Sequence, residues 1–259
     1  MTSTPNTLRR KLETGAPAFG VGVRLTQSVE IARLLAVGGY DWIFIDLEHS
    51  YYTLETACQL SLTSLSAGIT PLVRVPTGQY TMGTRALDGG AWGIVVPHVE
   101  NAETARAAVH QFKFPPVGMR SVGPAMPQMD YISSAQGADA FNKDMLLVAV
   151  IETPKGVENA GEIAAVPGID VLLVGTNDLA MTMGVPGGLA HEKVISGYKK
   201  VIEACTANGK WPGVGGVYDD VRLPEIVRMG FKLVIAGVDQ GFLVAGLKQR
   251  LDVLRKSAG

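Results

Sequence analysis

The sequence contains little cysteine, because only Cys58 and Cys205 occur among its 259 residues. Two cysteines do not support a disulfide framework or a cysteine-based zinc site. Both fall in segments with the apolar spacing of amphipathic helices, where a small buried thiol is common. The first eleven residues are polar and lack the apolar region of a signal peptide, so the sequence predicts a cytoplasmic protein.

The sequence also lacks an excess of either charge and any long apolar run. Its 23 lysines and arginines nearly balance its 24 aspartates and glutamates, and the formal net charge is −1. Without a basic excess, no nucleic-acid partner is expected. No apolar run approaches the roughly 20 residues of a membrane span, so no membrane partner is expected. With 47% apolar and 18% charged residues, the composition excludes a disordered chain.

Short apolar runs alternate with helical patterns along the whole chain. Near-continuous apolar runs are typical of buried parallel strands, and strict alternation with helices favours βαβ units. Eight such units predict one α/β domain over residues 1–259, a (β/α)8 TIM barrel, with residues 1–15 as a polar N-terminal segment. An open doubly wound sheet, which more often has roughly five to seven strands, is the alternative. The expected strands are residues 19–23, 42–45, 71–75, 93–96, 146–151, 171–174, 213–217 and 232–235.

Helices are expected after these strands, except where a long irregular segment intervenes. Residues 115–139 are rich in proline and glycine and are too long for an ordinary connection, so they predict a functional loop or lid. The expected helices are residues 29–37, 54–67, 80–87, 102–112, 131–141, 154–165, 191–208, 223–229 and 242–256. A polar turn is expected after the sixth strand, before the helix at residues 191–208.

Polar residues that directly follow the strands are the candidates for chemistry, because TIM-barrel active sites lie at the carboxyl ends of the strands. Asp46, Glu48 and His49 follow the second strand, and Arg74 lies within the third. An arginine among apolar residues needs an anionic partner. His49 is the candidate base because an imidazole titrates near neutral pH, and Asp46 or Glu48 could fix its tautomer. His98, after the fourth strand, is a minor candidate.

Two carboxylates, Glu152 and Asp178, follow the fifth and sixth strands. They could share a proton, each could pair with a cation such as Arg74, or they could hold a hard divalent metal. The metal fits best, because Mg²⁺ sites commonly use one or two carboxylates together with water and substrate oxygens. A buried ion pair that stabilises the barrel mouth is the structural alternative.

Other segments give weaker or negative signals. Arg120, in the irregular segment, is either a solvated arginine or a ligand for an anionic or hydroxylated substrate. The glycines of residues 213–216 could bring their backbone close to a phosphate or carboxylate. No nucleotide-binding fingerprint is present, so no nucleotide cofactor is expected. No Schiff-base lysine ends an apolar strand, which favours metal-stabilised over imine-stabilised carbanion chemistry.

The sequence resembles the HpcH/HpaI aldolase family of metal-dependent class II pyruvate aldolases. The resemblance covers residues 20–251, and several separate motifs in one order are more specific than any single motif. The motifs are residues 40–42, 46–49, 73–76, 87–91, 115–120, 151–153, 175–179 and 236–239.

The resemblance implies a role for each candidate residue. Glu152 and Asp178 ligate a divalent metal (Mg²⁺, Mn²⁺ or Co²⁺), and Arg74 contacts the keto oxygen and stabilises the enolate. His49 transfers a proton through water, with Asp46 or Asp88 as a supporting carboxylate. The backbone N–H groups near Thr176 to Asp178 hold the pyruvate carboxylate, so Gly175, Thr176 and Asn177 are candidate substrate-binding residues. Arg120 remains a substrate-binding candidate on its residue type alone.

The resemblance also implies a homo-oligomer, typically a hexamer, in which the last helix, with the apolar face of residues 243–254, packs on a neighbouring subunit. Three positions depart from the family pattern. Val150 stands where relatives have glutamine, Leu47 where many have glycine, and Thr176-Asn177 where they have Pro-Ala. These changes leave the donor acid open between pyruvate, a bulkier 2-oxo acid and hydroxypyruvate.

The sequence therefore predicts a divalent-metal-dependent aldolase, a carbon–carbon lyase. Its partners are small molecules: a 4-hydroxy-2-oxo acid is cleaved reversibly to a pyruvate-type 2-oxo acid and an aldehyde. One alternative is a lyase of CoA thioesters related to the citrate lyase β-subunit, which needs a basic nucleotide-binding surface. The other is a non-catalytic barrel that binds a 2-oxo acid.

Overall fold

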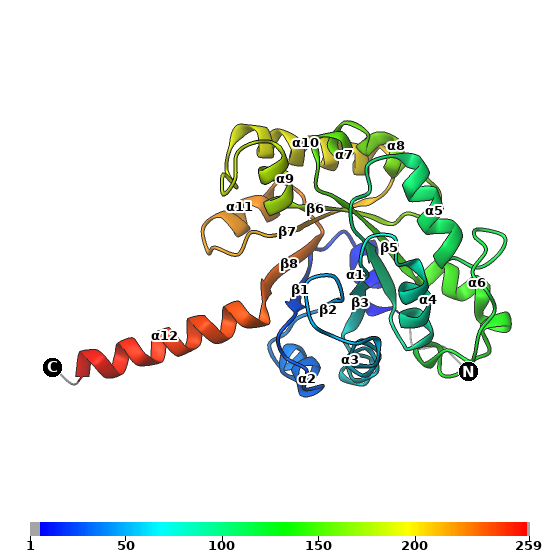
Figure 1. The fold of residues 1–259 in the computed structure, drawn as a ribbon, viewed down its shortest axis with the longest axis horizontal. Coiled ribbons are helices and arrows are strands. Elements are labelled where there is room, and N and C mark those ends of the chain that lie inside the picture. Colours follow the sequence, from blue (N-terminus) through cyan, green and yellow to red (C-terminus); the bar gives the residue numbers. More distant parts are fainter. Residues whose placement is uncertain (1–5, 258–259) are drawn as a thin grey trace.

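Eight parallel strands pair in chain order, and β8 pairs with β1 to close a barrel (Figure 1). The structure is a computed structural model and describes residues 6–257. The predicted TIM barrel is confirmed, and the open doubly wound alternative is wrong. The strands are β1 (Ala18–Val23), β2 (Trp42–Asp46), β3 (Thr70–Arg74), β4 (Gly93–Val96), β5 (Leu146–Ile151), β6 (Val171–Gly175), β7 (Trp211–Gly215) and β8 (Leu233–Val238).

Helices surround the barrel, as the alternating pattern predicted (Figure 1). They are α1 (Thr7–Glu13), α2 (Glu30–Val37), α3 (Leu54–Ala67), α4 (Tyr80–Asp88), α5 (Ala102–Phe112), α6 (Ser134–Asp144), α7 (Pro154–Glu158), α8 (Ala160–Ala164), α9 (Thr176–Thr182), α10 (Glu192–Ala207), α11 (Arg222–Arg228) and α12 (Asp239–Ser257), with a 3₁₀ turn at Pro127–Met129.

The strands are apolar along their length because both of their faces are covered. One face packs against the surrounding helices, and the other fills the barrel interior with alternate side chains such as Trp42, Phe44 and Leu72. Gly20 makes room for this filling, because a Cβ there would lie 2.3 Å from the Trp42 ring. The interior is therefore a packed core, and chemistry is confined to the ends of the barrel.

Helix α1 covers the end of the barrel where the strands begin. Its Leu8 and Leu12 are buried in the interior cluster, and the Leu8 amide donates to Thr70, the first residue of β3. The sequence presented residues 1–15 only as a polar segment, of which residues 1–5 lie outside the described part. Because α1 closes this end, the carboxyl ends of the strands form the accessible end.

Three further elements differ from the sequence prediction. The polar turn expected after the sixth strand is the short helix α9, and the helix expected over residues 154–165 is broken at Asn159 into α7 and α8. The helix expected from residue 131 begins at Ser134, because Asp130 and Tyr131 adopt the left-handed conformation that interrupts a helix.

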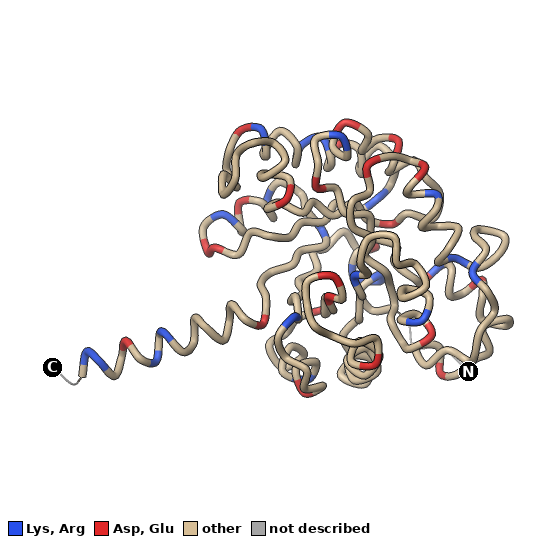
Figure 2. Tube along the Cα trace, in the orientation of Figure 1, with Lys and Arg blue, Asp and Glu red and all other residues tan. Residues whose placement is uncertain are grey.

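Helix α12 projects away from the barrel (Figure 1). Its first turn contacts β1 and β8, whereas Leu243, Leu247, Leu251 and Leu254 along its length are exposed. Acidic and basic residues are interspersed along the trace (Figure 2). Within residues 6–257 no helix has the length and apolar character needed to cross a membrane. Packing of α12 on a neighbouring subunit stays a prediction.

Candidate active site

A cavity of about 100 Å³ lies at the carboxyl ends of the strands. Of the residues that the sequence placed at strand ends, Arg74, Glu152 and Asp178 line it, because parallel strands present their carboxyl ends on one side of a barrel. Phe44, Val150, Leu173 and Ile235 form its apolar floor. Its polar lining includes Arg24, Arg74, Glu152, Thr176, Asn177 and Asp178.

Glu152 and Asp178 line this cavity together. Thr182 at the end of α9 donates to the backbone carbonyl of Glu152 over 3.1 Å, and Thr176 at its start lies 2.8 Å from the Tyr198 hydroxyl of α10. These contacts hold α9, whose first turn carries Asp178, beside the end of β5. The two acids therefore come from adjacent strand-end segments.

The Glu152 carboxylate is buried and only partly satisfied. Its Oε1 accepts the His98 backbone amide at 2.7 Å, and the His98 ring Nδ1 lies 3.1 Å from the same oxygen. Burial raises the pKa of Glu152 above its ordinary value; His98 opposes this increase, and the charge of Asp178 adds to it. A bound cation would stabilise the ionised form of a buried carboxylate that lies beside a second acid.

These residues fit a divalent metal. A Cβ at position 175 would lie 2.8 Å from Glu152 Oε2, so Gly175 leaves space beside that oxygen, which has no hydrogen-bond partner among the described residues. Residues 6–257 contain no cluster of three or more His, Cys, Asp or Glu side chains arranged to hold a metal. A two-carboxylate donor set suits a hard cation that takes its other oxygens from water and substrate.

Arg74 has the anionic partners that its place in an apolar strand predicted. Its Nε and one terminal nitrogen donate to the two Asp46 oxygens at 2.9 and 2.5 Å, and its other terminal nitrogen lies 3.2 Å from Glu48 Oε2. The guanidinium lies over the Phe44 ring, 5.2 Å from its centroid. Burial lowers the pKa of Arg74, but the hydrogen bonds and charges of Asp46 and Glu48 raise it by more. The pKa of Arg74 is therefore above its ordinary value, and the side chain stays cationic.

Asp46 organises the polar groups after β2. It is fully buried, and its Oδ1 also accepts the backbone amides of Glu48 and His49 at 3.0 and 3.1 Å. Burial raises the pKa of Asp46, but the hydrogen bonds and charge of Arg74 and the charge of Arg24 outweigh this and hold it below its ordinary value. Asp46 thus holds the His49 backbone and the Arg74 side chain, not the His49 ring.

We expect Asp46→Asn to lower the free energy of unfolding by about 3 kcal/mol, because it removes the charge of a buried ion pair. The pKa of Asp46 is lower in the folded protein than its ordinary value of 3.8, so its stabilisation is present above that pH and is lost as the pH falls below it. Urea unfolding of both proteins should give a constant difference from neutral to mildly acidic pH. A difference that persists unchanged in strong acid would contradict this origin.

His49 lies beside the cavity rather than in it. Its ring is exposed, and Nε2 is 3.8 Å from Glu48 Oε2. With Arg24, Glu48 and Tyr51 it lines an adjoining outer cavity of about 540 Å³. The structure therefore places His49 next to the acids and Arg74, open to solvent and to a ligand that extends outward.

The structure does not bring Asp88 or Arg120 to either cavity. Arg120 donates to Asp88 Oδ1 at 2.6 Å, and its guanidinium lies 4.6 and 4.7 Å from the ring centroids of Phe114 and Phe141. Arg120 is 2% exposed, so the interpretation as a solvated arginine is wrong. The irregular segment that contains Arg120 runs along the outside of the barrel near α6 (Figure 1).

Sequence reasoning missed Arg24 and undervalued His98. Arg24 directly follows β1, as Glu152 follows β5, so the rule applied to the other strands also identifies it. His98 follows β4 in a left-handed conformation, with φ +53°, which directs its amide to Glu152. The backbone conformation of a single residue has no signature in the sequence pattern.

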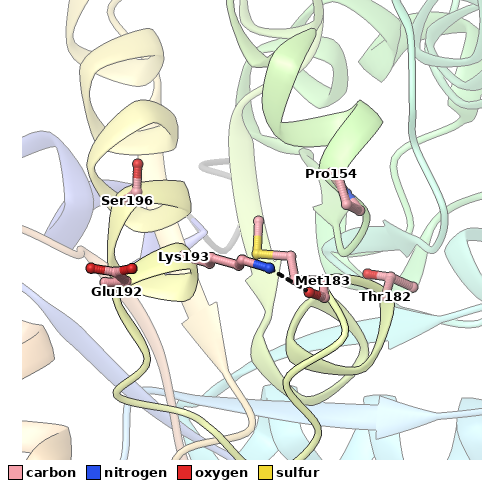
Figure 3. A pocket seen from close by; sticks show the side chains of 6 residues that line it. All are labelled: Pro154, Thr182, Met183, Glu192, Lys193 and Ser196. Carbon is pink, nitrogen blue, oxygen red and sulfur yellow. Dashed lines mark hydrogen bonds between the residues drawn. The ribbon is translucent and has the colours of Figure 1, made fainter.

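A larger cavity, of about 670 Å³, lies between α7, α9 and α10 (Figure 3). Its charged residues, Glu192 and Lys193, are neighbours in the first turn of α10, and Lys193 Nζ donates to the Met183 carbonyl at 3.4 Å. It has no second carboxylate and no arginine among its lining residues. The smaller cavity at the strand ends therefore remains the candidate active site.

A closed eight-stranded barrel with acids at its strand ends is the architecture of a TIM-barrel enzyme. The profile of the HpcH/HpaI aldolase/citrate lyase family matches residues 25–245, and the chain belongs to this family. It is 40% identical over 227 residues to 4-hydroxy-4-methyl-2-oxoglutarate aldolase cghB of Chaetomium globosum, covering 85% of this chain and 83% of that protein.

Other similarities span nearly the whole chain. It is 32% identical to 4-hydroxy-2-oxo-heptane-1,7-dioate aldolase of Salmonella newport, covering 98% of this chain and 97% of that protein. The crystal structure of an HpcH/HpaI aldolase from Desulfitobacterium hafniense superposes with a TM-score of 0.90 at 30% identity, covering 96% of each chain. The predicted family is confirmed.

Proposed function

We propose that this chain is a divalent-metal-dependent aldolase that reversibly cleaves a 4-hydroxy-2-oxo acid to pyruvate, or a related 2-oxo acid, and an aldehyde. The observation that carries the proposal is the meeting of Glu152, Asp178 and the cation of Arg74 in one small cavity. The relatives named as aldolases of 4-hydroxy-2-oxo acids support it.

Glu152 and Asp178 would hold the metal, for which Mg²⁺, Mn²⁺ and Co²⁺ are the candidates. A bound divalent ion supplies positive charge to the carboxylate and keto oxygens of the 2-oxo acid and so favours enolate formation. Backbone groups of Gly175, Thr176 and Asn177, which line the same cavity, would hold the acid's carboxylate.

In the cleavage direction, the C4 hydroxyl loses its proton to His49 through water, and the C3–C4 bond breaks. The C4–O bond becomes the aldehyde carbonyl, and the bonding pair passes to C3 as the enolate of the 2-oxo acid. Arg74 faces the charge that develops on the enolate oxygen, and Asp46 and Glu48 hold its guanidinium in place beforehand. C3 then takes a proton back from His49 through water, which gives the 2-oxo acid and returns His49 to its neutral form.

Removal of metal should abolish activity. We expect no new carbon–carbon product from pyruvate and glycolaldehyde or glyoxylate in excess chelator, and recovery when Mg²⁺ or Mn²⁺ is added back, because Glu152 and Asp178 alone supply no positive charge. Product formation is measured by chromatography and mass. Full activity in chelator would remove the metal from the proposal, and no product from any acceptor and donor acid in the presence of metal would remove the aldolase.

A further inference from the structure

We infer that Arg24 binds a carboxylate on the aldehyde-derived part of the substrate, so that the enzyme selects 4-hydroxy-2-oxo acids that carry a second carboxylate beyond C4. The inference rests on the proposed function and adds a specificity residue to it.

Arg24 stands between the two cavities at the barrel mouth. It lines the inner cavity with Arg74, Glu152 and Asp178, and it also lines the outer cavity with His49. Among the residues that line these cavities in the described part of the chain, Arg24 is the one that they share. We consider a substrate that places its 2-oxo acid end in the inner cavity and extends the rest toward His49. Such a substrate lies next to the Arg24 guanidinium.

The Arg24 guanidinium retains unused hydrogen-bonding capacity. Its Nε lies 2.7 Å from Asp46 Oδ2, whereas its two terminal nitrogens donate no hydrogen bond within residues 6–257. Arg74 differs, because all three of its nitrogens contact Asp46 or Glu48. The two terminal nitrogens of an arginine lie in one plane and can donate a pair of hydrogen bonds to the two oxygens of a carboxylate. In Arg24 these two nitrogens are available for such a pair.

The backbone of Arg24 is fixed by hydrogen bonds to Asp239. The Asp239 carboxylate, in the first turn of α12, accepts the amides of Arg24, Leu25 and Thr26 at 3.2, 3.0 and 2.7 Å. The Arg24 side chain is 37% exposed, so its charge is neither buried in the core nor free in solvent. A fixed backbone reduces the ordering cost of binding, which makes this arginine suited to recognition.

Charge favours a carboxylate over a more highly charged group. Arg24 and Arg74 together balance Asp46 and Glu48, and Glu152 and Asp178 remain for a divalent cation. Glu48 also lines the outer cavity, where it would repel the second charge of a phosphate. A singly charged, planar anion fits this surrounding best.

The test compares two acceptors of equal carbon number with pyruvate as donor: glyoxylate, which carries a carboxylate, and glycolaldehyde, which carries a hydroxymethyl group. For Arg24→Met we expect kcat/KM for glyoxylate to fall about 10- to 100-fold, mainly through KM, because a hydrogen-bonded charge is lost. The value for glycolaldehyde should fall much less, because that acceptor has no carboxylate for Arg24 to bind. Arg24→Lys should recover part of the glyoxylate activity, and Arg33→Met, at an exposed arginine of α2, should change neither.

The possible outcomes are distinct. Equal losses for both acceptors would mean that Arg24 acts through Asp46 and Arg74, and would overturn the inference, as would unchanged glyoxylate kinetics. A native enzyme that uses glycolaldehyde but rejects glyoxylate also overturns it while leaving the aldolase intact. If the native enzyme with metal makes no product from any acceptor, the proposed function fails and the inference fails with it. Urea unfolding shows that each variant is folded under assay conditions.

Discussion

Replacing Arg74 by alanine is expected to lower kcat about 100-fold or more, as the loss of one preorganised oxyanion donor does in other enzymes. The guanidinium is held by Asp46 and Glu48 before any substrate binds, so it needs little reorganisation when the enolate forms. Turnover is measured with saturating metal and saturating donor and acceptor. Near-normal turnover by Arg74→Ala would count heavily against a role at the enolate.

Two controls separate chemistry from folding. Arg74→Lys keeps a positive charge but cannot reproduce the paired hydrogen bonds to Asp46, so an intermediate kcat is expected. Metal affinity, measured by calorimetric titration, should change little, because Arg74 is not one of the proposed ligands. A variant that loses metal binding and turnover together would point to a collapsed site rather than to a missing enolate partner.

The barrel could be predicted from the sequence because a parallel barrel leaves a simple signal. Strands covered on both faces are apolar along their length, so β4 and β5 have the bounds that their apolar runs predicted. Short helices leave no such signal. Helix α9, with seven residues, is too short to show an amphipathic period, and its Thr-Asn-Asp start looked like a turn.

The strand-end residues of the site could also be predicted, whereas contacts made by loops could not. Arg74 and Glu152 are far apart in sequence, but parallel topology alone brings the ends of β3 and β5 to one side. Arg120 lies in an irregular segment whose path depends on tertiary packing. Its pairing with Asp88 between two aromatic rings has no periodic pattern that would indicate it.

The partners of Asp46 also could not be predicted, because they depend on the path of the loop after β2. The sequence placed it beside His49 and suggested that its carboxylate could orient the imidazole. In the structure it accepts the His49 amide and the Arg74 guanidinium, because the chain turns sharply after β2 and the buried carboxylate needs the nearest cation. Residue type and spacing predicted the cluster, but the partner of each atom depends on the turn.

Replacing Glu152 by glutamine is expected to weaken metal binding and to lower activity about 1,000-fold or more, because a metal supplies several kcal/mol of transition-state charge stabilisation. The amide keeps an oxygen that accepts the His98 backbone N–H, so the local fold should survive while the negative charge is lost. Metal affinity is measured by calorimetric titration and activity by product formation at a fixed metal concentration.

Asp178→Asn should show the same coupled loss, since Asp178 is the other proposed ligand in the cavity. Glu158→Gln is the matched control, because Glu158 is exposed on α7 six residues along the chain and should leave both quantities unchanged. If Glu152→Gln binds metal as tightly as the native protein yet is inactive, Glu152 handles a proton instead, which its raised pKa would also suit. Coupled losses in both acid variants therefore distinguish a metal pair from an acid–base pair, the two chemistries that adjacent carboxylates can perform.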